Sequence, residues 1–262
     1  MFQPQLMQGQ RILVTGGGTG LGQAMAEKFL ELGADVAICG RRKAVCDETA
    51  EQWRTRFPGQ RVDTFGVDIR VAPAVDEMVE ALFQSGGLTG LINNAAGNFI
   101  APTESLSARA FDAIANIVFH GSFYVTQAVG KRWVEQAKAG AWQRGQPFRN
   151  VMSIITTWVD NGSPYVVPSA MSKAGIEVMT KAGSNSRESC AVLHTRCGHQ
   201  RTWLGTRPLS PRSPQRRRIT TVTGAREWLS RRRQDVAAGA LPPRRAAAQN
   251  GMSTPEEEGD TP

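Results

Sequence analysis

The chain has 262 residues, of which 40% are hydrophobic, and a formal net charge of +8. This length suits one α/β domain with a sizeable core, and no apolar run reaches the roughly 18 residues of a membrane-spanning helix. The charge is unevenly placed, because residues 182–262 hold 14 of the 31 basic side chains and 7 of the 23 acidic ones. Residues 1–181 are therefore almost neutral, and the basic total does not indicate a nucleic-acid-binding protein.

The N-terminus and the cysteines restrict the class of protein further. Residues 1–10 lack the charged and then apolar pattern of a signal peptide. The four cysteines, Cys39, Cys46, Cys190 and Cys197, show no spacing typical of a zinc site. We therefore expect a cytoplasmic protein with reduced thiols and without a metal.

The first predicted element is a strand over residues 12–14, which leads directly into a glycine-rich turn and an amphipathic helix. Glycines allow the backbone to turn tightly and to approach a ligand closely. The N-terminus of the helix offers free N–H groups and a positive dipole end to a pyrophosphate. This order of strand, turn and helix is typical of a dinucleotide site. The candidate contacts in the turn are Gly16, Gly18, Thr19, Gly20, Leu21 and Gly22.

A second strand, over residues 36–39, ends at Gly40, Arg41 and Arg42. In a dinucleotide-binding fold this position lies beside the adenosine ribose, where an acidic residue binds a 2′-hydroxyl and an arginine suits a 2′-phosphate. Arg41 and Arg42 therefore favour NADP(H) as the cofactor over NAD(H). The alternative is that both are ordinary surface arginines.

Strands and helices continue to alternate up to residue 181, with apolar residues that repeat every three to four positions in the helices. The alternation predicts a doubly wound, parallel α/β sheet of the Rossmann type, with ligands at the C-terminal ends of the strands. The later predicted elements are a third strand over 61–67, a fourth over 91–92, a helical region over 111–138, a fifth strand over 150–155 and a helix that begins at Pro168.

Longer strings in the sequence are more specific than the glycine turn. They are Asn-Asn-Ala-Ala-Gly-Asn-Phe-Ile at 93–100 and Val-Val-Pro-Ser-Ala at 166–170. Asp68 and Lys173 are two further single residues at the spacing that the family pattern has. With these strings the chain resembles the short-chain dehydrogenase/reductase family, and within it the 2,4-dienoyl-CoA reductases. The resemblance covers residues 10–181 and implies an NADPH-dependent oxidoreductase that reduces unsaturated acyl-CoA thioesters.

The residues expected at the catalytic centre depart from ordinary carbonyl reduction. Common members of the family place a tyrosine four residues before the lysine, on the same helix face, where the ammonium lowers the phenol pKa. Here Ser169 is four residues before Lys173, while Tyr165 precedes Pro168 and so lies off the helix. Thr156 takes the place of the usual active-site serine. Reduction of a conjugated thioester needs hydrogen-bond donors at the thioester oxygen rather than that tyrosine.

The resemblance implies a role for each further site residue. Asn98 would be the amide donor at the thioester, Lys173 would bind the nicotinamide ribose, and Ser169 would assist from one turn away. Taken singly, these residues also have structural explanations, since Asn98 can cap a turn and Ser169 can occupy a first helical turn. The remaining implied contacts are Arg41, Asp68 and Asn94 to the cofactor, and Arg70, Phe99 and Ser107 to the acyl-CoA.

One departure from the dienoyl-CoA reductase pattern concerns the acid. Better-known members place a catalytic tyrosine where this chain has Trp158. An indole N–H donates a hydrogen bond but does not act as an acid. Three interpretations are open: Tyr165 reaches the pocket instead, the donor is weaker, or the activity is reduced.

The family pattern stops after Lys181. In residues 182–262, Leu, Ile, Val and Phe number 9 of 81, below the level that supports a core, and 14 arginines stand without a lysine. We therefore predict a first domain over 1–181 that lacks the family's sixth and seventh strands, and an Arg/Pro-rich tail over 182–262. A shifted reading frame is the preferred explanation of the tail, ahead of a disordered segment and of a nucleic-acid-binding segment.

Together these observations predict an NADPH-dependent, 2,4-dienoyl-CoA reductase-like enzyme of fatty acid metabolism. The first alternative is a generic NADP-dependent carbonyl reductase of the same family, and the second is a catalytically dead remnant that at most binds dinucleotide. The expected partner is the acyl-CoA substrate, with neither a membrane nor a nucleic acid involved. Members of the family form homo-oligomers. Because residues 182–262 depart from the family pattern, that assembly is in question here.

Overall fold

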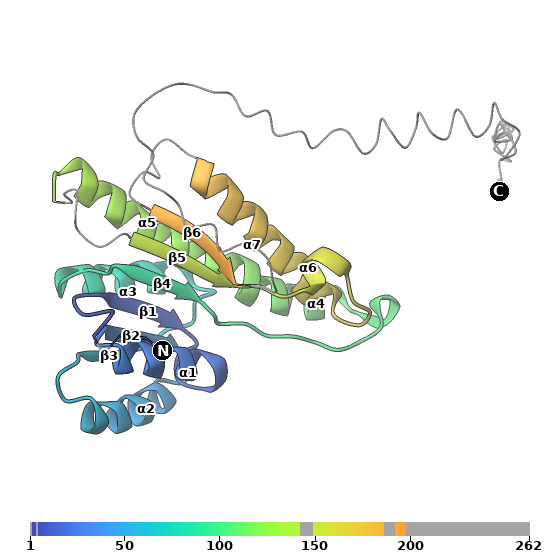
Figure 1. Ribbon diagram of the computed structural model, residues 1–262. Helices are drawn as coiled ribbons and strands as arrows, with labels where there is room; N and C mark the ends of the chain where they lie inside the picture. Colours follow the sequence, from blue (N-terminus) through green and yellow to red (C-terminus); the bar gives the residue numbers. More distant parts are fainter. Residues whose placement is uncertain (1, 4, 142–148, 186–191, 198–262) are drawn as a thin grey trace, which may run out of the picture. The chain divides into compact units, whose positions relative to one another are not determined.

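The computed structural model describes residues 2–3, 5–141, 149–185 and 192–197 of the chain (Figure 1). Its strands form one parallel sheet in the order β3-β2-β1-β4-β5-β6. The strand order reverses between β1 and β4, as in a doubly wound sheet, so the predicted fold class is confirmed. The strands are β1 Arg11–Thr15, β2 Asp35–Gly40, β3 Val62–Gly66, β4 Gly90–Asn93, β5 Arg149–Ile154 and β6 Val192–Cys197.

Helices connect these strands and return the chain to the start of the sheet each time, which is why every ladder is parallel. The helical elements are α1 Gly20–Glu31, α2 Lys43–Arg56, α3 Ala72–Gln84, the 3₁₀ turn η1 Thr103–Ser105, α4 Ala108–Ala115, the π-helix η2 Asn116–Gly121, α5 Ser122–Lys138, α6 Trp158–Asn161 and α7 Val167–Asn185.

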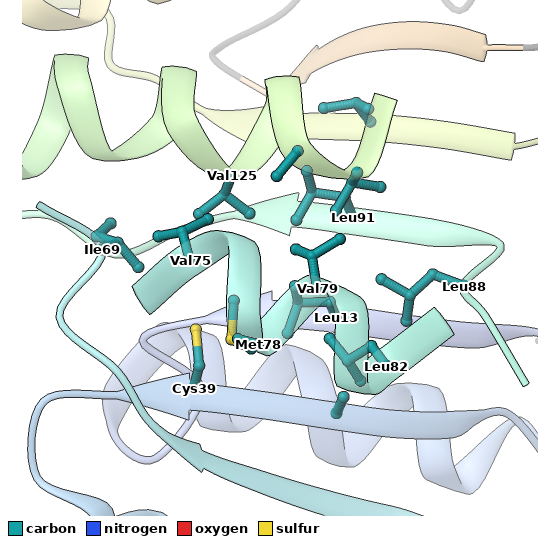
Figure 2. Close-up of a cluster of buried hydrophobic side chains, with 14 of the residues drawn as sticks. Leu13, Cys39, Ile69, Val75, Met78, Val79, Leu82, Leu88, Leu91 and Val125 are labelled. Carbon is teal, nitrogen blue, oxygen red and sulfur yellow. The ribbon is translucent and has the colours of Figure 1, made fainter. Parts of the chain in front are cut away.

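The core consists of two apolar layers, one on each face of the sheet. On one face, Ile12 and Val14 of β1 pack with residues of α1 and α2. On the other face, Leu13 of β1 and Leu91 of β4 pack with residues of α3 and α5. Figure 2 shows this second layer, in which Val79 and its neighbours on α3 lie against the strands. Because β1 is buried on both faces, its C-terminal end is a fixed point from which a ligand site can be built.

The long helix predicted over 111–138 is three consecutive pieces, α4, η2 and α5. In a π-helix the backbone hydrogen bonds span five residues in place of four. One such turn leaves the apolar spacing almost unchanged, so the sequence pattern did not reveal it. The last predicted helix begins at Val167, one residue before Pro168, and the single-turn helix α6 ahead of it was not predicted.

The expectation that the fold lacks a sixth strand is wrong. Helix α7 continues to Asn185, and all six residues of β6 pair in parallel with β5. The strand escaped notice because His194 and Arg196 interrupt any apolar run, whereas the ladder itself is made by backbone groups. The first compact unit of the chain includes β6 and so extends beyond the boundary that we predicted at residue 181.

Residues 198–262, with most of the Arg/Pro-rich tail, lie outside the described residues, and so does any seventh strand. The predictions of a shifted, disordered or nucleic-acid-binding tail therefore stay predictions. Across the described ranges, no helix has the length and apolar character needed to cross a membrane. Within those ranges, also, no three His, Cys, Asp or Glu side chains are grouped so that they could hold a metal ion.

Candidate functional site

A cavity of about 660 Å³ opens at the C-terminal end of the sheet, beside the point where the strand order reverses. Its walls come from the glycine turn after β1, the end of β2 with the start of α2, and the segments that follow β3 and β4. In doubly wound folds this crevice is where ligands bind. The predicted cofactor residues that line it are Gly16, Gly18, Thr19, Arg41, Arg42, Asp68 and Asn94.

The glycine turn needs glycine for two different reasons. Gly16 has φ +66°, and a Cβ there would lie 3.1 Å from the Cα of Ala95, so conformation and space both disfavour a side chain. Gly22 lies inside α1, where a Cβ would come within 2.4 Å of the Gly16 carbonyl oxygen. Gly22 therefore packs α1 against the turn. It does not line the cavity, and neither do Gly20 and the exposed Leu21 at the start of α1.

A threonine that the sequence analysis did not select joins the two central strands at the cavity. Thr15, the last residue of β1, accepts hydrogen bonds through Oγ1 from the N–H groups of Asn94 and Ala95, each at 3.0 Å. The side-chain amide of Asn94 also donates a hydrogen bond to the Thr15 carbonyl at 3.0 Å. Asn94 is thus held by β1 while it lines the cavity, and its predicted place at the cofactor site rests on this support. A polar residue at the end of a buried strand is the feature that could have identified Thr15.

The predicted 2′-phosphate site is exposed and lies beside an ion pair. Arg41 and Arg42 are solvent-exposed where β2 gives way to α2. Asp68 accepts hydrogen bonds from the Arg70 guanidinium, 2.9 Å from Nε and 2.6 Å from Nη2. These bonds, with a smaller contribution from the charge of Arg41, lower the pKa of Asp68 although burial opposes the shift. Arg70, which the resemblance assigned to the acyl-CoA, is the partner of Asp68 and lies outside the cavity lining.

Two buried thiols line the cavity, and the sequence analysis did not anticipate them as site residues. Cys39 ends the buried part of β2, Cys46 lies on α2, and both are free. Burial raises the pKa of Cys39 to about 12 and also raises the pKa of Cys46. Both thiols are therefore protonated near neutral pH, so they present a neutral, polarisable surface to a ligand and not a nucleophile.

Helix α7 carries Ser169 and Lys173 on one face, since they are four residues apart. Ser169 is buried in the first turn of the helix, and Lys173 is half-buried. Burial lowers the pKa of Lys173 because desolvation disfavours its ammonium group. Packing of Ile176 against Ile114 and Val118 fixes the helix against α4 and η2. Neither Ser169 nor Lys173 is among the residues that line the cavity.

Two loops beside α7 hold the other predicted catalytic residues. Tyr165 has φ +66°, which is strained for a residue with a side chain, and its carbonyl accepts a hydrogen bond from the Ala101 N–H at 3.0 Å. This bond ties the loop of Tyr165 to the loop of Asn98 and Phe99, which are both exposed. Phe99 is 47% exposed and so is not the core aromatic that a purely structural role would require. Trp158 is partly buried at the start of α6.

Ser107, assigned by resemblance to the acyl-CoA, has a structural role in the fold. It is the N-cap of α4, and its Oγ accepts a hydrogen bond from the Ala110 N–H at 3.1 Å. Such a cap satisfies one of the free N–H groups at a helix start. Ser107 lies outside the cavity lining.

The π-helix η2 is the largest feature of the site that the sequence analysis missed. Its residue Ile117 lines the cavity, and Phe119 lies against Gly175 of α7, where a Cβ would be 2.6 Å from the phenyl ring. Nδ1 of His120 and Oδ1 of Asn116 are 2.9 Å apart. The π-helix therefore forms the contact between the cavity wall and the helix that carries Lys173. Single π-helical turns are frequent at functional sites.

The chain matches known proteins over about two thirds of its length. The family model described as short chain dehydrogenase matches residues 10–189. An uncharacterised oxidoreductase of Caenorhabditis elegans is 44% identical over 181 residues, which are 68% of this chain and 55% of that protein. A probable 2,4-dienoyl-CoA reductase of the same organism is 42% identical over 178 residues, or 67% of this chain and 54% of that protein. A probable 2,4-dienoyl-CoA reductase of Bacillus subtilis is 36% identical over 176 residues, which are 67% of this chain and 65% of that protein.

A solved structure has the same fold at appreciable sequence identity. It is a short chain dehydrogenase from Bacillus anthracis, with a TM-score of 0.59 and 37% identity, covering 66% of this chain and 68% of that one. The chain spans about half the length of the two C. elegans relatives. The region matched by the family model contains every predicted site residue, from Gly16 to Lys173.

Proposed function

Since this chain belongs to the short-chain dehydrogenase family, we propose that it is an NADPH-dependent oxidoreductase that reduces unsaturated acyl-CoA thioesters. The observation that carries the proposal lies on α7, where buried Ser169 takes the place of the tyrosine that ordinary carbonyl reduction requires four residues before Lys173. Relatives at 36% and 42% identity that are named probable 2,4-dienoyl-CoA reductases support the same substrate class.

The residues of the cavity fit a phosphorylated dinucleotide. Gly16 and Gly18 leave the backbone open to close approach, and the first turn of α1 has no side-chain cap on its N–H groups, which suits a pyrophosphate. Arg41 and Arg42 stand at the end of β2, where a 2′-phosphate is recognised. When bound, the cofactor supplies a hydride to the conjugated system. In the proposal Lys173 holds the nicotinamide ribose and so orients the reactive end.

The chain's own contribution to the chemistry is hydrogen bonding at the thioester oxygen. Hydride addition to a conjugated system moves negative charge onto that oxygen, and a donor fixed beside it stabilises the transition state. We assign this donor to the side-chain amide of Asn98, whose exposed position leaves it accessible to a substrate. Ser169 assists from the first turn of α7. Of the acyl-CoA contacts, Phe99 is the best placed, because Arg70 would first have to leave Asp68.

The direct test is NADPH consumption by the full chain with a 2,4-dienoyl-CoA and, separately, with a simple ketone. Turnover of the thioester but not of the ketone supports the proposal. Turnover of the ketone instead indicates a generic carbonyl reductase. Binding of NADPH without turnover of either compound indicates a remnant that only binds the cofactor.

The cofactor preference is tested by Arg41→Asp. The variant removes a charged donor and adds a repulsive carboxylate beside the 2′-phosphate, so the Kd for NADPH should rise by about tenfold to a hundredfold, while the Kd for NADH falls or stays constant. Fluorescence titration of both cofactors measures the two constants. Lys131→Asp, at an exposed position on α5 outside the cavity lining, makes the same charge change and should alter neither. Equal Kd values for the two cofactors in the parent chain would refute the preference.

The proposal keeps the cytoplasm as the compartment and an acyl-CoA as the partner. The thiols of Cys39 and Cys46 are free, as is usual in a reducing compartment. Neither a membrane nor a nucleic acid has a part in the proposed reaction.

A further inference from the structure

The glycine turn of the cavity is held from behind by helix α2. The hydroxyl of Thr49 donates a hydrogen bond to the carbonyl oxygen of Gly18 at 3.0 Å, across 31 positions of the sequence. Both residues are buried, and Thr49 does not line the cavity. Cys46 precedes Thr49 by three residues on α2, and its Sγ lies 3.1 Å from the place that a Cβ of Gly18 would occupy. Helix α2 therefore contacts the turn through two residues on the same face.

The hydrogen bond that the Thr49 hydroxyl donates differs from those that three other helical hydroxyls donate. Thr55, Ser172 and Thr180 each donate to the carbonyl four residues earlier in the same helix, at 3.1, 2.7 and 2.9 Å. That is the usual partner of a serine or threonine within a helix. Thr49 reaches another segment instead and satisfies a buried carbonyl to which no backbone N–H of the described residues donates.

The same bond determines where the next N–H group points. A trans peptide is planar, and its C=O and N–H groups point in opposite directions. Because the Gly18 carbonyl is directed at Thr49, the N–H of Thr19 in the same peptide faces away from Thr49. Gly18 and Thr19 both line the cavity, whereas Thr49 does not. Thr19 is the N-cap of α1, and its N–H donates to no other residue in the described ranges.

We propose that Thr49 is a positioning residue for the dinucleotide: it holds the Gly18 carbonyl and thereby aims the Thr19 N–H at the pyrophosphate. The inference rests on the proposed function, because it places a dinucleotide in the cavity. Without the hydroxyl, the Gly18–Thr19 peptide is free to rotate, and the N–H leaves the direction in which a helix N-terminus binds an anion.

The test is Thr49→Val, which replaces the hydroxyl by a methyl group of similar size. Fluorescence titration of the full chain should show the Kd for NADPH and the Kd for NADH rising by the same factor, about fivefold to tenfold, because both carry the pyrophosphate. The Kd for adenosine 2′-monophosphate should not change. That probe has the adenosine and the 2′-phosphate for Arg41 and Arg42 but no pyrophosphate.

Two matched variants separate positioning from stability. Thr49→Ser keeps the hydroxyl and should restore the parent affinities. Thr55→Val removes a hydroxyl from the same helix that bonds only within that helix, and it should leave all three Kd values unchanged. A purely structural Thr49 would lower the melting temperature of Thr49→Val without changing the affinity of the folded protein.

Each outcome of these titrations either supports or overturns the positioning role of Thr49. Unchanged NADPH affinity in Thr49→Val overturns the inference, and so does an equal loss for adenosine 2′-monophosphate, which would mean that α2 has shifted as a whole. Thr49→Ala provides the same measurement where the valine variant does not fold. A parent chain that binds neither NADPH nor NADH overturns the proposed function and the inference with it, whereas a binding parent with an unaffected variant overturns the inference alone.

Discussion

Arg11 and Lys173 are both cationic side chains that the described part of the chain removes from water, and their surroundings differ. Arg11 is 7% exposed and donates to the carbonyls of Leu82, Ser85 and Gly87, and Asp63 pairs with it at 2.6 Å. Lys173 is half-buried, and burial lowers its pKa. The two terminal nitrogens of Arg11 are thus satisfied by the fold, while its buried Nε has no hydrogen-bond partner among the described residues. Lys173 retains an electrostatic cost of the kind found where a charge serves a ligand.

Lys173→Met should therefore stabilise the protein while it removes activity. The melting temperature should rise, because an apolar side chain of similar length replaces an ammonium that the site disfavours, and turnover should fall about a hundredfold or more through loss of cofactor orientation. The pH dependence has a definite sign. Since the folded pKa of Lys173 lies below its ordinary value of 10.5, the parent gains stability as the pH rises between the two, and the variant lacks this gain.

Thermal unfolding at several pH values and an activity assay check both effects. Lys131→Met, at an exposed lysine of α5, is the control and should alter neither the activity nor the pH dependence. A lower melting temperature for Lys173→Met at every pH would contradict the electrostatic account.

Sequence spacing identified seven of the sixteen residues that line the cavity, but not the pairs that they form. Arg41 and Asp68 were expected at the cofactor site and line the cavity. The pairing of Asp68 with Arg70 was not expected, because the resemblance assigned Asp68 to the cofactor and Arg70 to the acyl-CoA. Thr15 supports the site and Cys46 lines it. The polar residue at the end of buried β1 was a signal for Thr15, whereas the residue type of Cys46 gave none. Position along a motif is readable from a sequence, whereas side-chain partners depend on tertiary packing.

At the level of elements, the π-helix η2 contacts both the cavity, through Ile117, and helix α7, through Phe119. Gly121, the last residue of η2, is buried where a Cβ would come within 2.6 Å of Cδ1 and 2.7 Å of Cγ1 of Ile69. Ile69 is itself buried and lines the cavity. This close contact sets the distance between the helix and the segment that follows β3.

Gly121→Ala should accordingly destabilise the fold. The added methyl group overfills a packed site, so the free energy of unfolding should fall by about 1–3 kcal/mol. Gly130→Ala, farther along α5 where no atom lies within 4 Å of the added Cβ, is the matched control and should raise it by up to about 1 kcal/mol. Urea denaturation of the two variants measures both changes. Equal changes in both would show that helix propensity, and not the contact with Ile69, determines the effect.

Elements with a regular apolar pattern were predictable, and those defined by backbone geometry alone were not. Strands β1, β2 and β4 followed from hydrophobic spacing. The π-turn of η2 differs from an α-helix in its hydrogen bonds and hardly in its apolar pattern. Strand β6 contains His194 and Arg196, so its place at the sheet depends on ladder bonds to β5 that residue types do not report.

At the scale of the whole chain, the cavity proposed for the cofactor and the residues assigned to catalysis come from stretches that overlap only between residues 98 and 117. The cavity is lined by residues between Gly16 and Ile117, whereas the residues assigned to catalysis lie between Asn98 and Lys173. The cavity is therefore complete well before the tail begins. We expect binding of the dinucleotide to depend little on residues 182–262, and turnover to depend on them more strongly, because a closed site must exclude water.

This division leads to a prediction about the tail itself. Residues 182–262 contain 14 arginines and no lysine, and Leu, Ile, Val and Phe together number only 9 of these 81 residues. This composition indicates a shifted reading frame. The coding DNA after codon 181, read in one of its other two frames, should encode a helix end and then a strand followed by Asn and Pro-Gly within about 25 residues, a length typical of one αβ unit. That segment would replace the end of α7 and the strand β6 of the present chain. A chain rebuilt in that frame should consume NADPH with a dienoyl-CoA at least about tenfold faster, since a fully enclosed substrate is held closer to the reactive geometry. Its Kd for NADPH, set mainly by the cavity residues, should change much less. If neither frame encodes a helix and then a strand, the tail is native to this protein, and its composition has another cause.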